Sequence, residues 1–256
     1  MKNNILFLAL TLLFSVSYAQ ENFIFSIHAV QIEGDLEAFE KVESLYMQKV
    51  AQAAVDNGDI MGWSFNKTVH LDNINDEENY NYTFIQMSSN IEMLLSEKSN
   101  WWTNTASILS ADEQKEVAEL SKKFTWKKDV RVLYHTETSF WDEYDGALAF
   151  QFNFASPKNL DGFIAENKNL WGPYFQENKA KLKMIGWGVA TKIHPQGHDW
   201  SSVVTWDIFK NLADLYQYRI GVEGLTYPVE ASKMAIYNPD GFEDRPIHIG
   251  LASTKN

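Results

Sequence analysis

The hydrophobic pattern of this chain alternates between a period of two and a period near 3.6, which predicts alternating strands and helices. Residues 23–32 are rich in apolar and β-branched side chains and predict a strand. Gly34 ends this run, and Asp35 is in position to cap a helix. Apolar residues then recur at steps of three and four over residues 36–53. That spacing predicts an amphipathic helix of about five turns, which ends at residues 57–58, Asn-Gly.

Three more strands and two more helices complete the first half of the pattern. Residues 89–92, Ser-Asn-Ile-Glu, and residues 110–113, Ser-Ala-Asp-Glu, each have the form of a capping box and predict a helix start. The strands are predicted at residues 61–71, at residues 80–87 and within residues 128–140.

The second half of the chain follows the same order. Ser156 and Pro157 combine an N-cap residue with a first-turn proline, and they predict the start of a helix whose apolar stripe runs to Leu182. The other elements are predicted as strands at residues 147–154, 186–193, 202–209 and 247–252, and as helices from residue 211 and at residues 231–238.

Short segments of the first half recur in the second half. Met-Gly-Trp at residues 61–63 returns as Ile-Gly-Trp at 185–187, at a spacing of 124. Thr-Val-His at residues 68–70 returns as Lys-Ile-His at 192–194, at the same spacing. A long period that occurs twice indicates two copies of one small domain. We assign the first copy to residues 20–143 and the second to residues 144–256.

Each copy has the order β-α-β-β-α-β, which predicts an α+β fold of two tandem ferredoxin-like repeats. The helices of such a repeat cover one face of a four-stranded antiparallel sheet. Trp63 and Trp187 lie on a bulky strand face, and we expect the two sheets to bury these faces against each other. The opposite face is small, with Gly62 and Gly186 among its members, and we expect it to lie toward the helices.

The element order and the repeated Gly-Trp strand resemble the dimeric α+β-barrel superfamily, in a tandem single-chain form. This superfamily includes antibiotic-biosynthesis-monooxygenase-like, EthD-like and NIPSNAP-like proteins. The resemblance covers nearly all of the chain after residue 19. It implies an intramolecular α+β barrel and a binding pocket between a sheet and its helices. A single-chain barrel already covers its own sheet faces, so we expect a monomer.

The composition narrows the cellular setting and the class of partner. Residues 1–19 have the form of a signal peptide: Lys2 precedes an apolar run, and small residues at 17 and 19 predict cleavage after Ala19. A periplasmic or secreted protein is therefore expected. The chain has no cysteine, so it has no disulfide and no thiolate nucleophile. Its net charge of −12 argues against nucleic acid and against anionic membranes as partners.

His70 and His194 are the candidate catalytic residues, because both copies carry a histidine at the end of the same strand. The alternative is a strand-end histidine that duplication has copied without a chemical role. Trp63 and Trp187 are candidate ligand-stacking residues, although wide aromatic residues also fill barrel cores. Ser64 and Asn66 are further candidate ligand-binding residues, because the small strand face leaves room for a ligand.

A metal site is not predicted, and neither is a bound cofactor. His194, His198 and Asp199 lie close in sequence, but they occupy a predicted hairpin turn and the first copy lacks the second histidine. His28, His135 and His248 could join them only in three dimensions. The chain also lacks the sequence motifs of the familiar hydrolases and nucleotide-binding enzymes.

Three functions remain open on this basis. The first is an exported protein that binds a small apolar or aromatic molecule between sheet and helices. The second is a cofactor-independent monooxygenase or a haem-handling enzyme that uses His70 or His194. The third is a structural or interaction protein with an exposed apolar patch.

Overall fold

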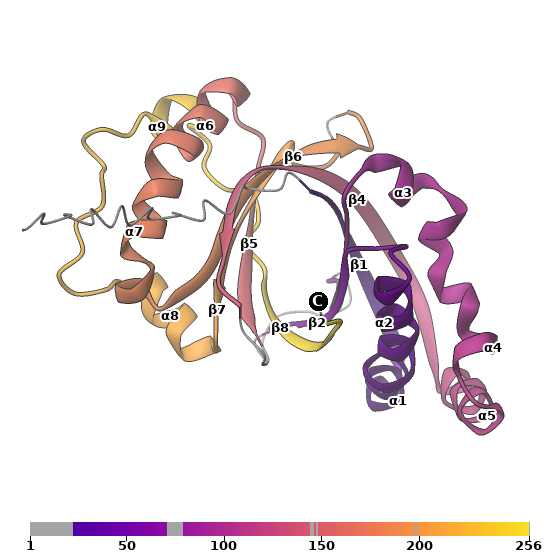
Figure 1. Ribbon diagram of the computed structural model, residues 1–256. Helices are drawn as coiled ribbons and strands as arrows, with labels where there is room; N and C mark the ends of the chain where they lie inside the picture. Colours follow the sequence, from indigo (N-terminus) through magenta and orange to yellow (C-terminus); the bar gives the residue numbers. More distant parts are fainter. Residues whose placement is uncertain (1–22, 71–78, 144–145, 147, 198, 256) are drawn as a thin grey trace, which may run out of the picture.

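The computed structural model describes residues 23–70, 79–143, 146, 148–197 and 199–255. The predicted leader at residues 1–19 and the turn residue His198 lie outside the described residues. Eight antiparallel strands close into a barrel in the order β1-β3-β2-β8-β5-β7-β6-β4 (Figure 1). The strands are β1 (Ile24–Gly34), β2 (Gly62–Thr68), β3 (Tyr82–Ser88), β4 (Phe124–Trp141), β5 (Ala149–Ala155), β6 (Met184–His194), β7 (Val203–Phe209) and β8 (Ile247–Ser253).

The barrel consists of two equivalent halves. The first four strands lie in the order β4-β1-β3-β2 and the last four in the order β8-β5-β7-β6, which is the ferredoxin-like arrangement in each case. Antiparallel pairing of β2 with β8, and of β4 with β6, joins the halves. The predicted fold of two tandem repeats in one intramolecular α+β barrel is therefore confirmed.

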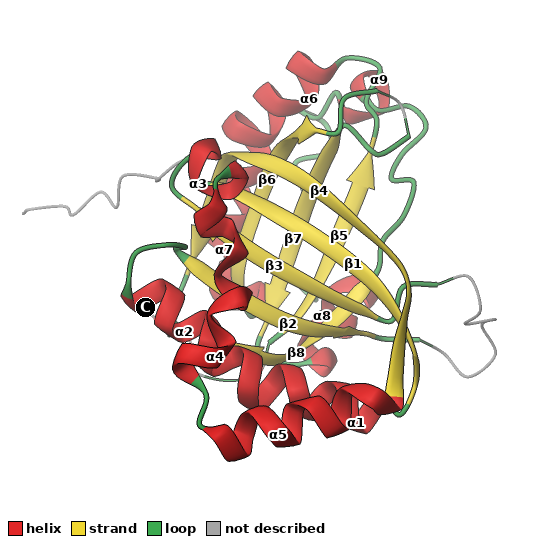
Figure 2. Cartoon of the chain, turned by 90° about the vertical axis from the view of Figure 1, so that its right-hand side faces the viewer, coloured by secondary structure: helices red, strands yellow, loops and turns green. Residues whose placement is uncertain are grey.

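Helices cover the outside of the barrel on two sides (Figures 1 and 2). In the first repeat a continuous helical stretch contains α1 (Leu36–Lys41), a π-helical segment η1 (Val42–Met47) and α2 (Gln48–Asp56). In the second repeat the equivalent stretch contains α6 (Leu160–Glu166), a π-helical segment η5 (Asn167–Trp171) and α7 (Gly172–Leu182). The remaining helices are α3 (Ile91–Leu95), η3 (Glu97–Asn104), α4 (Thr105–Ile108), α5 (Ala111–Leu120), η4 (Ser121–Lys123), α8 (Leu212–Ile220) and α9 (Met234–Tyr237). Within the described ranges, none of these is long and apolar enough to cross a membrane.

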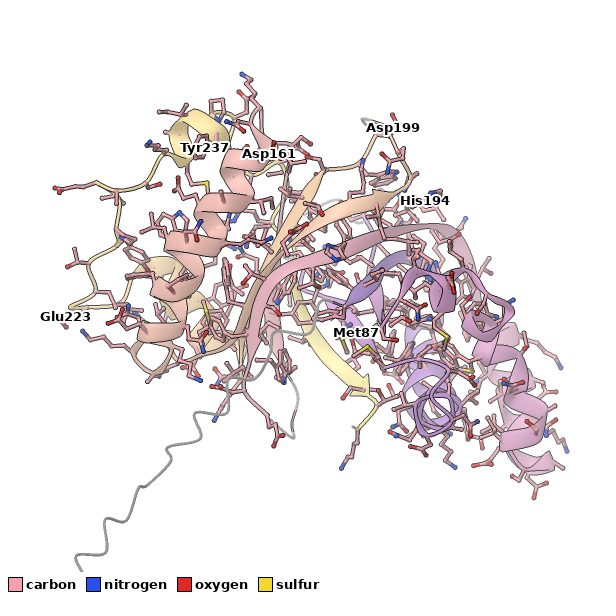
Figure 3. The ribbon with its side chains drawn as sticks, turned by 45° about the horizontal axis from the view of Figure 1, so that its top comes forward. Met87, Asp161, His194, Asp199, Glu223 and Tyr237 are labelled. Atoms are coloured by element: carbon pink, nitrogen blue, oxygen red, sulfur yellow. The ribbon has the colours of Figure 1, made fainter. Side chains whose placement is uncertain are left out.

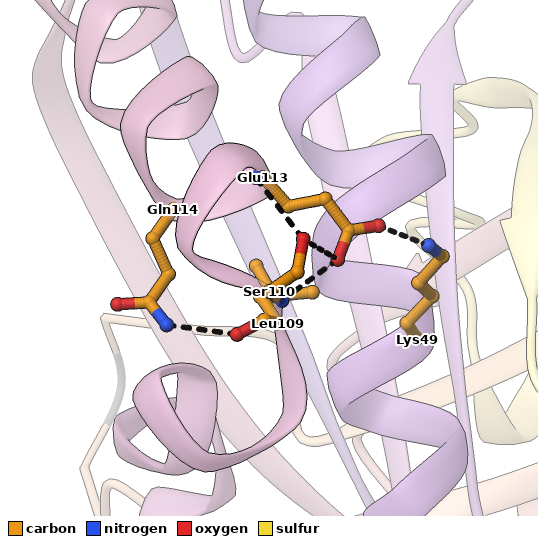
Figure 4. Close-up of polar contacts among 5 residues, drawn as sticks. All are labelled: Lys49, Leu109, Ser110, Glu113 and Gln114. Atoms are coloured by element: carbon orange, nitrogen blue, oxygen red, sulfur yellow. Dashed lines mark hydrogen bonds and ion pairs between the residues drawn. The ribbon is translucent and has the colours of Figure 1, made fainter.

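Side-chain capping fixes several helix starts where the sequence predicts them. Asp35 Oδ1 accepts a hydrogen bond of 3.0 Å from the Ala38 amide and caps α1. Ser110 and Glu113 form a reciprocal capping box at α5, and Lys49 of α2 forms an ion pair with Glu113 (Figure 4). This ion pair and the capping bonds lower the pKa of Glu113 to about 2. The contact ties α5 to the helix beneath it.

Two predicted helix starts are wrong, one by a single residue and the other by three. The cap of α3 is Asn90 rather than Ser89, and α3 has only five residues before a 3₁₀ segment follows. The cap of α6 is Asn159, whose side chain accepts from the Gly162 amide, so Ser156 and Pro157 lie before the helix. In both cases an asparagine that can reach the third amide of the helix takes the role that sequence spacing gave to a serine.

The prediction of which strand face looks inward is also wrong. Trp63 and Trp187 lie on the helix side of the sheet, in the cores of the first and second repeats respectively. The small face of β2 and β6 looks into the barrel. The reason is the volume of the neighbouring side chains: Phe25, Phe150 and Trp206 fill the barrel interior. These rings leave space only for small residues on the adjacent strand.

Candidate functional site

The second repeat contains a cavity of about 320 Å³ between its sheet and its helices. Strands β5, β6 and β7 form its floor, and α6, η5, α7 and α8 contribute walls. The remaining wall comes from the segment between α8 and β8, residues 221–246, which we call the strap. The resemblance noted above placed a pocket between sheet and helices, and this cavity lies there.

Aromatic rings form the walls of the cavity. The rings of Phe175 and Trp187 have centroids 5.3 Å apart, and those of Trp171 and Phe175 lie 5.9 Å apart in a stacked arrangement. Gly172 permits this approach of α7 to the sheet, because a Cβ atom there would lie 3.1 Å from the Trp187 ring. Tyr218 of α8 completes the wall. These faces suit a flat apolar ring.

The floor of the cavity is polar. Asn153 of β5 donates through Nδ2 to Asp207 Oδ2 at 2.9 Å and to Thr205 Oγ1 at 3.1 Å. Its Oδ1 accepts from Arg245 Nε at 2.8 Å and from Gln151 Nε2. The amide of Asn153 therefore uses all of its hydrogen-bonding positions within the protein. This fixes the orientation of Asp207 and of Arg245 relative to each other.

Among the described residues that line the cavity, Asp207 is the one carboxylic acid, and it is 3 % exposed. Burial raises the pKa of Asp207 to about 6, although the Asn153 hydrogen bond and the charges of Arg245 and Arg219 oppose the shift. Among the residues that the structure describes, Asn153 alone donates to this carboxylate, and it does so to Oδ2. Oδ1 is left to accept a hydrogen bond from something in the cavity. Gln151 Oε1, also buried, has no partner among the described residues.

The equivalent position in the first repeat carries no acid. Asp207 pairs with Trp187 across β7 and β6, and Gln86 pairs with Trp63 across β3 and β2. Trp101 packs at this point: its Nε1 donates to Gln86 Oε1 at 3.4 Å, and its ring lies 6.0 Å from that of Trp63. The two copies have therefore diverged, and the buried carboxylate belongs to the second.

A buried glutamate fastens the strap over the cavity. Glu166, at the end of α6, accepts hydrogen bonds from Ser232 Oγ at 2.6 Å and from the Lys233 amide at 2.7 Å. It also accepts from Trp171 Nε1 at 2.9 Å. One carboxylate thus connects the strap to a wall residue of the cavity. Figure 1 shows the short helix α9 of the strap beside α6.

We expect Glu166→Gln to loosen the strap. The amide keeps one acceptor and loses the charge that strengthens three hydrogen bonds, which predicts a loss of about 1–3 kcal/mol in the free energy of unfolding. Amide hydrogen exchange should rise in residues 228–238 and stay unchanged in the barrel strands. Glu177→Gln on α7 is the matched control, because Glu177 is exposed. Equal exchange rates in the two variants would contradict the role of Glu166.

The predicted site residues do not gather in one place. Trp187 alone lines the cavity, whereas Trp63 packs in the first repeat. Asn66 lies on the barrel side of β2, where it donates to Ser64 Oγ and to the Thr83 carbonyl, each at 3.0 Å. The remaining two candidates are the histidines.

Neither candidate catalytic histidine lines the cavity. His70 lies 3.3 Å from the Tyr80 carbonyl and borders a different cavity of about 440 Å³ in the first repeat. His194 is exposed at the end of β6, and Figure 3 shows it near Asp199 and apart from Tyr237 of α9. A catalytic role for these two residues stays a prediction.

The other histidines have separate surroundings. His28 contacts Asp129 and His135 contacts Glu137, and both histidines are partly buried. His248 is 3 % exposed inside the barrel, where its ring stacks on Phe150 at 5.1 Å. Burial lowers the pKa of His248 to about 3, so it is neutral at pH 7. No group of three potential metal ligands occurs within the described part of the chain.

Sequence periodicity did not predict the polar floor of the cavity, because its residues alternate with large aromatic ones. Phe152 and Trp206 face the barrel, and Asn153, Thr205 and Asp207 face the helices. The sequence does contain a signal for this floor. Polar residues recur on one side of two strands, and both sides of these strands must be covered by other parts of the fold.

Comparison with known proteins places the fold. No protein-family model and no curated protein matches the sequence. Among solved structures, a candidate monooxygenase from Lactobacillus acidophilus NCFM aligns with a TM-score of 0.51 and 13 % identity, over 92 % of this chain and 97 % of that one. A candidate monooxygenase from Fusobacterium nucleatum aligns with a TM-score of 0.51 and 9 % identity, over 93 % and 96 %. An anthrone oxidase-like protein aligns with a TM-score of 0.52 and 10 % identity, over 92 % and 93 %. Together with the closed eight-strand barrel, these alignments show that the chain has the dimeric α+β-barrel fold in a tandem single-chain form.

Proposed function

We propose that the cavity of the second repeat binds a small hydroxyaromatic molecule. The aromatic ring lies among Trp171, Phe175 and Trp187, and the hydroxyl group donates a hydrogen bond to Asp207. The observation that carries the proposal is a buried carboxylate with one oxygen unused inside an aromatic cavity. A buried charge that lacks partners costs free energy, and a ligand that donates to it recovers part of that cost.

The size of the cavity supports a ligand of one or two rings. Binding pockets for small molecules measure roughly 300–1,000 Å³ and are mostly apolar with a few placed polar groups. At about 320 Å³, this cavity is at the lower end of that range. Its single carboxylate would set the orientation of the ligand, since the walls are aromatic.

The proposal is tested by calorimetric titration with two matched probes at pH 7.5. We expect 2-naphthol to bind and 2-methoxynaphthalene, whose ether oxygen cannot donate a hydrogen bond, to bind about tenfold more weakly. Asp207→Asn should remove this difference between the probes. Gln86→Asn, at the equivalent position of the first repeat, should leave it intact. Absence of binding by either probe would contradict the proposal.

A second candidate function is cofactor-independent monooxygenation at the same carboxylate. With a pKa near 6, Asp207 is mostly ionised at pH 7 and can accept a proton from a phenol or an activated methylene group. The electron-rich anion then reacts with O₂: a CH₂ group becomes C=O with one oxygen atom, and the other oxygen leaves as water. Oxygen uptake with anthrone, lost in Asp207→Asn, would support this candidate. Uptake no faster than the uncatalysed rate would remove it and leave the binding function.

Haem does not fit the cavity. Haem iron needs an axial ligand such as a histidine or a tyrosinate. None of the described histidines lines the cavity, so Met234 there lacks the histidine with which methionine holds haem, and burial raises the pKa of Tyr218, which disfavours its phenolate form. We therefore derive no step through haem.

A further inference from the structure

A second charged group, Arg245, marks the outer end of the cavity. It belongs to the strap, just before β8, and it is exposed while it lines the cavity. Its Nε donates to Asn153 Oδ1 at 2.8 Å, and its guanidinium lies 5.4 Å from the centre of the Phe242 ring. Among the described residues, the terminal nitrogens Nη1 and Nη2 have no hydrogen-bond partner or ion pair. Two parallel N–H donors therefore remain for a ligand.

Asn153 sets the distance between the two charges. Its Oδ1 accepts from Arg245 and its Nδ2 donates to Asp207, so the guanidinium and the acid lie on either side of one side-chain amide group. The acid is buried at the floor and the guanidinium is exposed. A ligand that lies along Asn153 meets an acceptor at its inner end and donors at its outer end.

The charges near the opening favour an anionic outer end. The charges of Arg245 and Arg219 both lower the pKa of Asp207, and of these two residues Arg245 lines the cavity. A cationic tail would approach the guanidinium of Arg245, whereas a carboxylate would form a bidentate pair with it. The net charge of −12 repels an anionic ligand mainly through distant charges. Salt screens that repulsion at separations beyond about 10 Å. Glu243 and Asp244, beside Arg245, are exposed and do not line the cavity, so the guanidinium is the charge that the outer end of the ligand meets.

We infer that the ligand is a hydroxyaromatic acid, whose hydroxyl group reaches Asp207 and whose carboxylate pairs with Arg245. This inference rests on the proposed binding function and adds the chemical class of the outer group. Arg245 is then the residue that selects among aromatic ligands by their charge.

The test uses three probes with the same hydroxynaphthyl ring and different tails. They are 6-hydroxy-2-naphthoate, which is anionic, 6-(hydroxymethyl)-2-naphthol, which is neutral, and 6-(aminomethyl)-2-naphthol, which is cationic. We expect the anion to bind the wild-type protein about tenfold more tightly than the neutral probe, and the cation to bind most weakly. The advantage of the anion should shrink as NaCl is raised, because the guanidinium is exposed.

Variants in the strap distinguish the effect of Arg245 from the effect of any positive charge on this segment. Arg245→Gln should remove the preference for the anion, so that the anionic and neutral probes bind the variant with nearly equal affinity. Arg245→Lys should keep part of the preference, since it retains the charge without the paired donors. Lys233→Gln removes one positive charge from the same strap at an exposed residue that does not line the cavity, and it should behave like the wild type.

The outcomes distinguish the inference from the function on which it rests. Equal affinity for the anionic and neutral probes, or an anion preference that survives in Arg245→Gln, would overturn the inference while the proposed function stands. Tighter binding of the cation would also overturn it. Failure of all three probes to bind would overturn the proposed function itself.

Discussion

The Asp207→Asn variant is expected to be more stable than the wild type above pH 7, although it loses the proposed binding function. Burial raises the pKa of Asp207 from 3.8 to about 6 in the folded protein. The folded state therefore holds the proton more tightly than the unfolded state does. The resulting cost is absent below pH 3.8, grows between pH 3.8 and 6, and is complete above pH 6. A shift of two pKa units corresponds to about 3 kcal/mol, which the neutral asparagine avoids.

Urea unfolding at pH 5 and pH 8 measures this effect. The stability gained by Asp207→Asn should be larger at pH 8 than at pH 5 by about 1 kcal/mol or more, because the carboxylate of the wild type is only partly ionised at pH 5. His248 and Glu43, whose pKa values burial moves to about 3 and about 8, are common to both proteins and cancel in the difference. Asp161→Asn, at an exposed residue of α6, should give the same difference at both pH values. A pH-independent gain in Asp207→Asn would contradict the burial of an ionisable Asp207.

Gly188→Ala is expected to destabilise the barrel by about 3 kcal/mol, the size typical of severe overpacking. A Cβ atom at Gly188 would lie 2.1 Å from the Trp206 ring and 2.8 Å from Ser139 Cβ. Trp206 is 7 % exposed and packs edge-on against Phe25, so its ring has little room to move.

Gly62→Ala is the matched control for this substitution. Gly62 is on the small face of β2, and its added Cβ would meet the end of the flexible Met87 side chain at 2.6 Å. We expect a much smaller loss there, because the methionine can rotate away. In the Gly188→Ala background, Trp206→Leu should cost less than it does in the wild type, since the methyl group then fills vacated space. Equal losses at the two glycines would contradict the placement of Trp206 inside the barrel.

Much of the fold could be predicted because its signals are local. The repeated Gly-Trp strand, the helical spacing of residues 36–53 and the capping residues Asp35 and Ser110 each act through neighbours in sequence. Element order then limits the topology, because a ferredoxin-like repeat has few alternatives. The prediction of two such sheets in one barrel needed no knowledge of side-chain contacts.

The face of each strand could not be predicted in the same way. Alternation shows that β6 has a bulky side with Trp187 and a small side with Gly188, but both sides are covered in this fold. Which side looks inward depends on the volume that Trp206 and Phe150 occupy on other strands. Those pairings are set by strand register across the barrel, which single-sequence periodicity does not contain.

The candidate site was hidden for a related reason. In the sequence, Asp207 is an ordinary polar position of an alternating strand. It becomes a buried acid only because helices cover that side of the strand. His70 and His194 attracted attention because duplication repeats them, yet repetition preserves strand ends as readily as it preserves chemistry. The divergence between Gln86 and Asp207, at matching register, is the more informative comparison.

Hydrogen exchange with and without 6-hydroxy-2-naphthoate tests directly where the ligand binds. We predict slower exchange in the strap and in the helical stretch that covers the cavity, residues 228–246 and 160–175, with no change in α1 and α2. The same experiment on Asp207→Asn should show no protection at equal probe concentration. Protection confined to the first repeat, or protection that is unchanged in Asp207→Asn, would contradict a binding site built around this carboxylate.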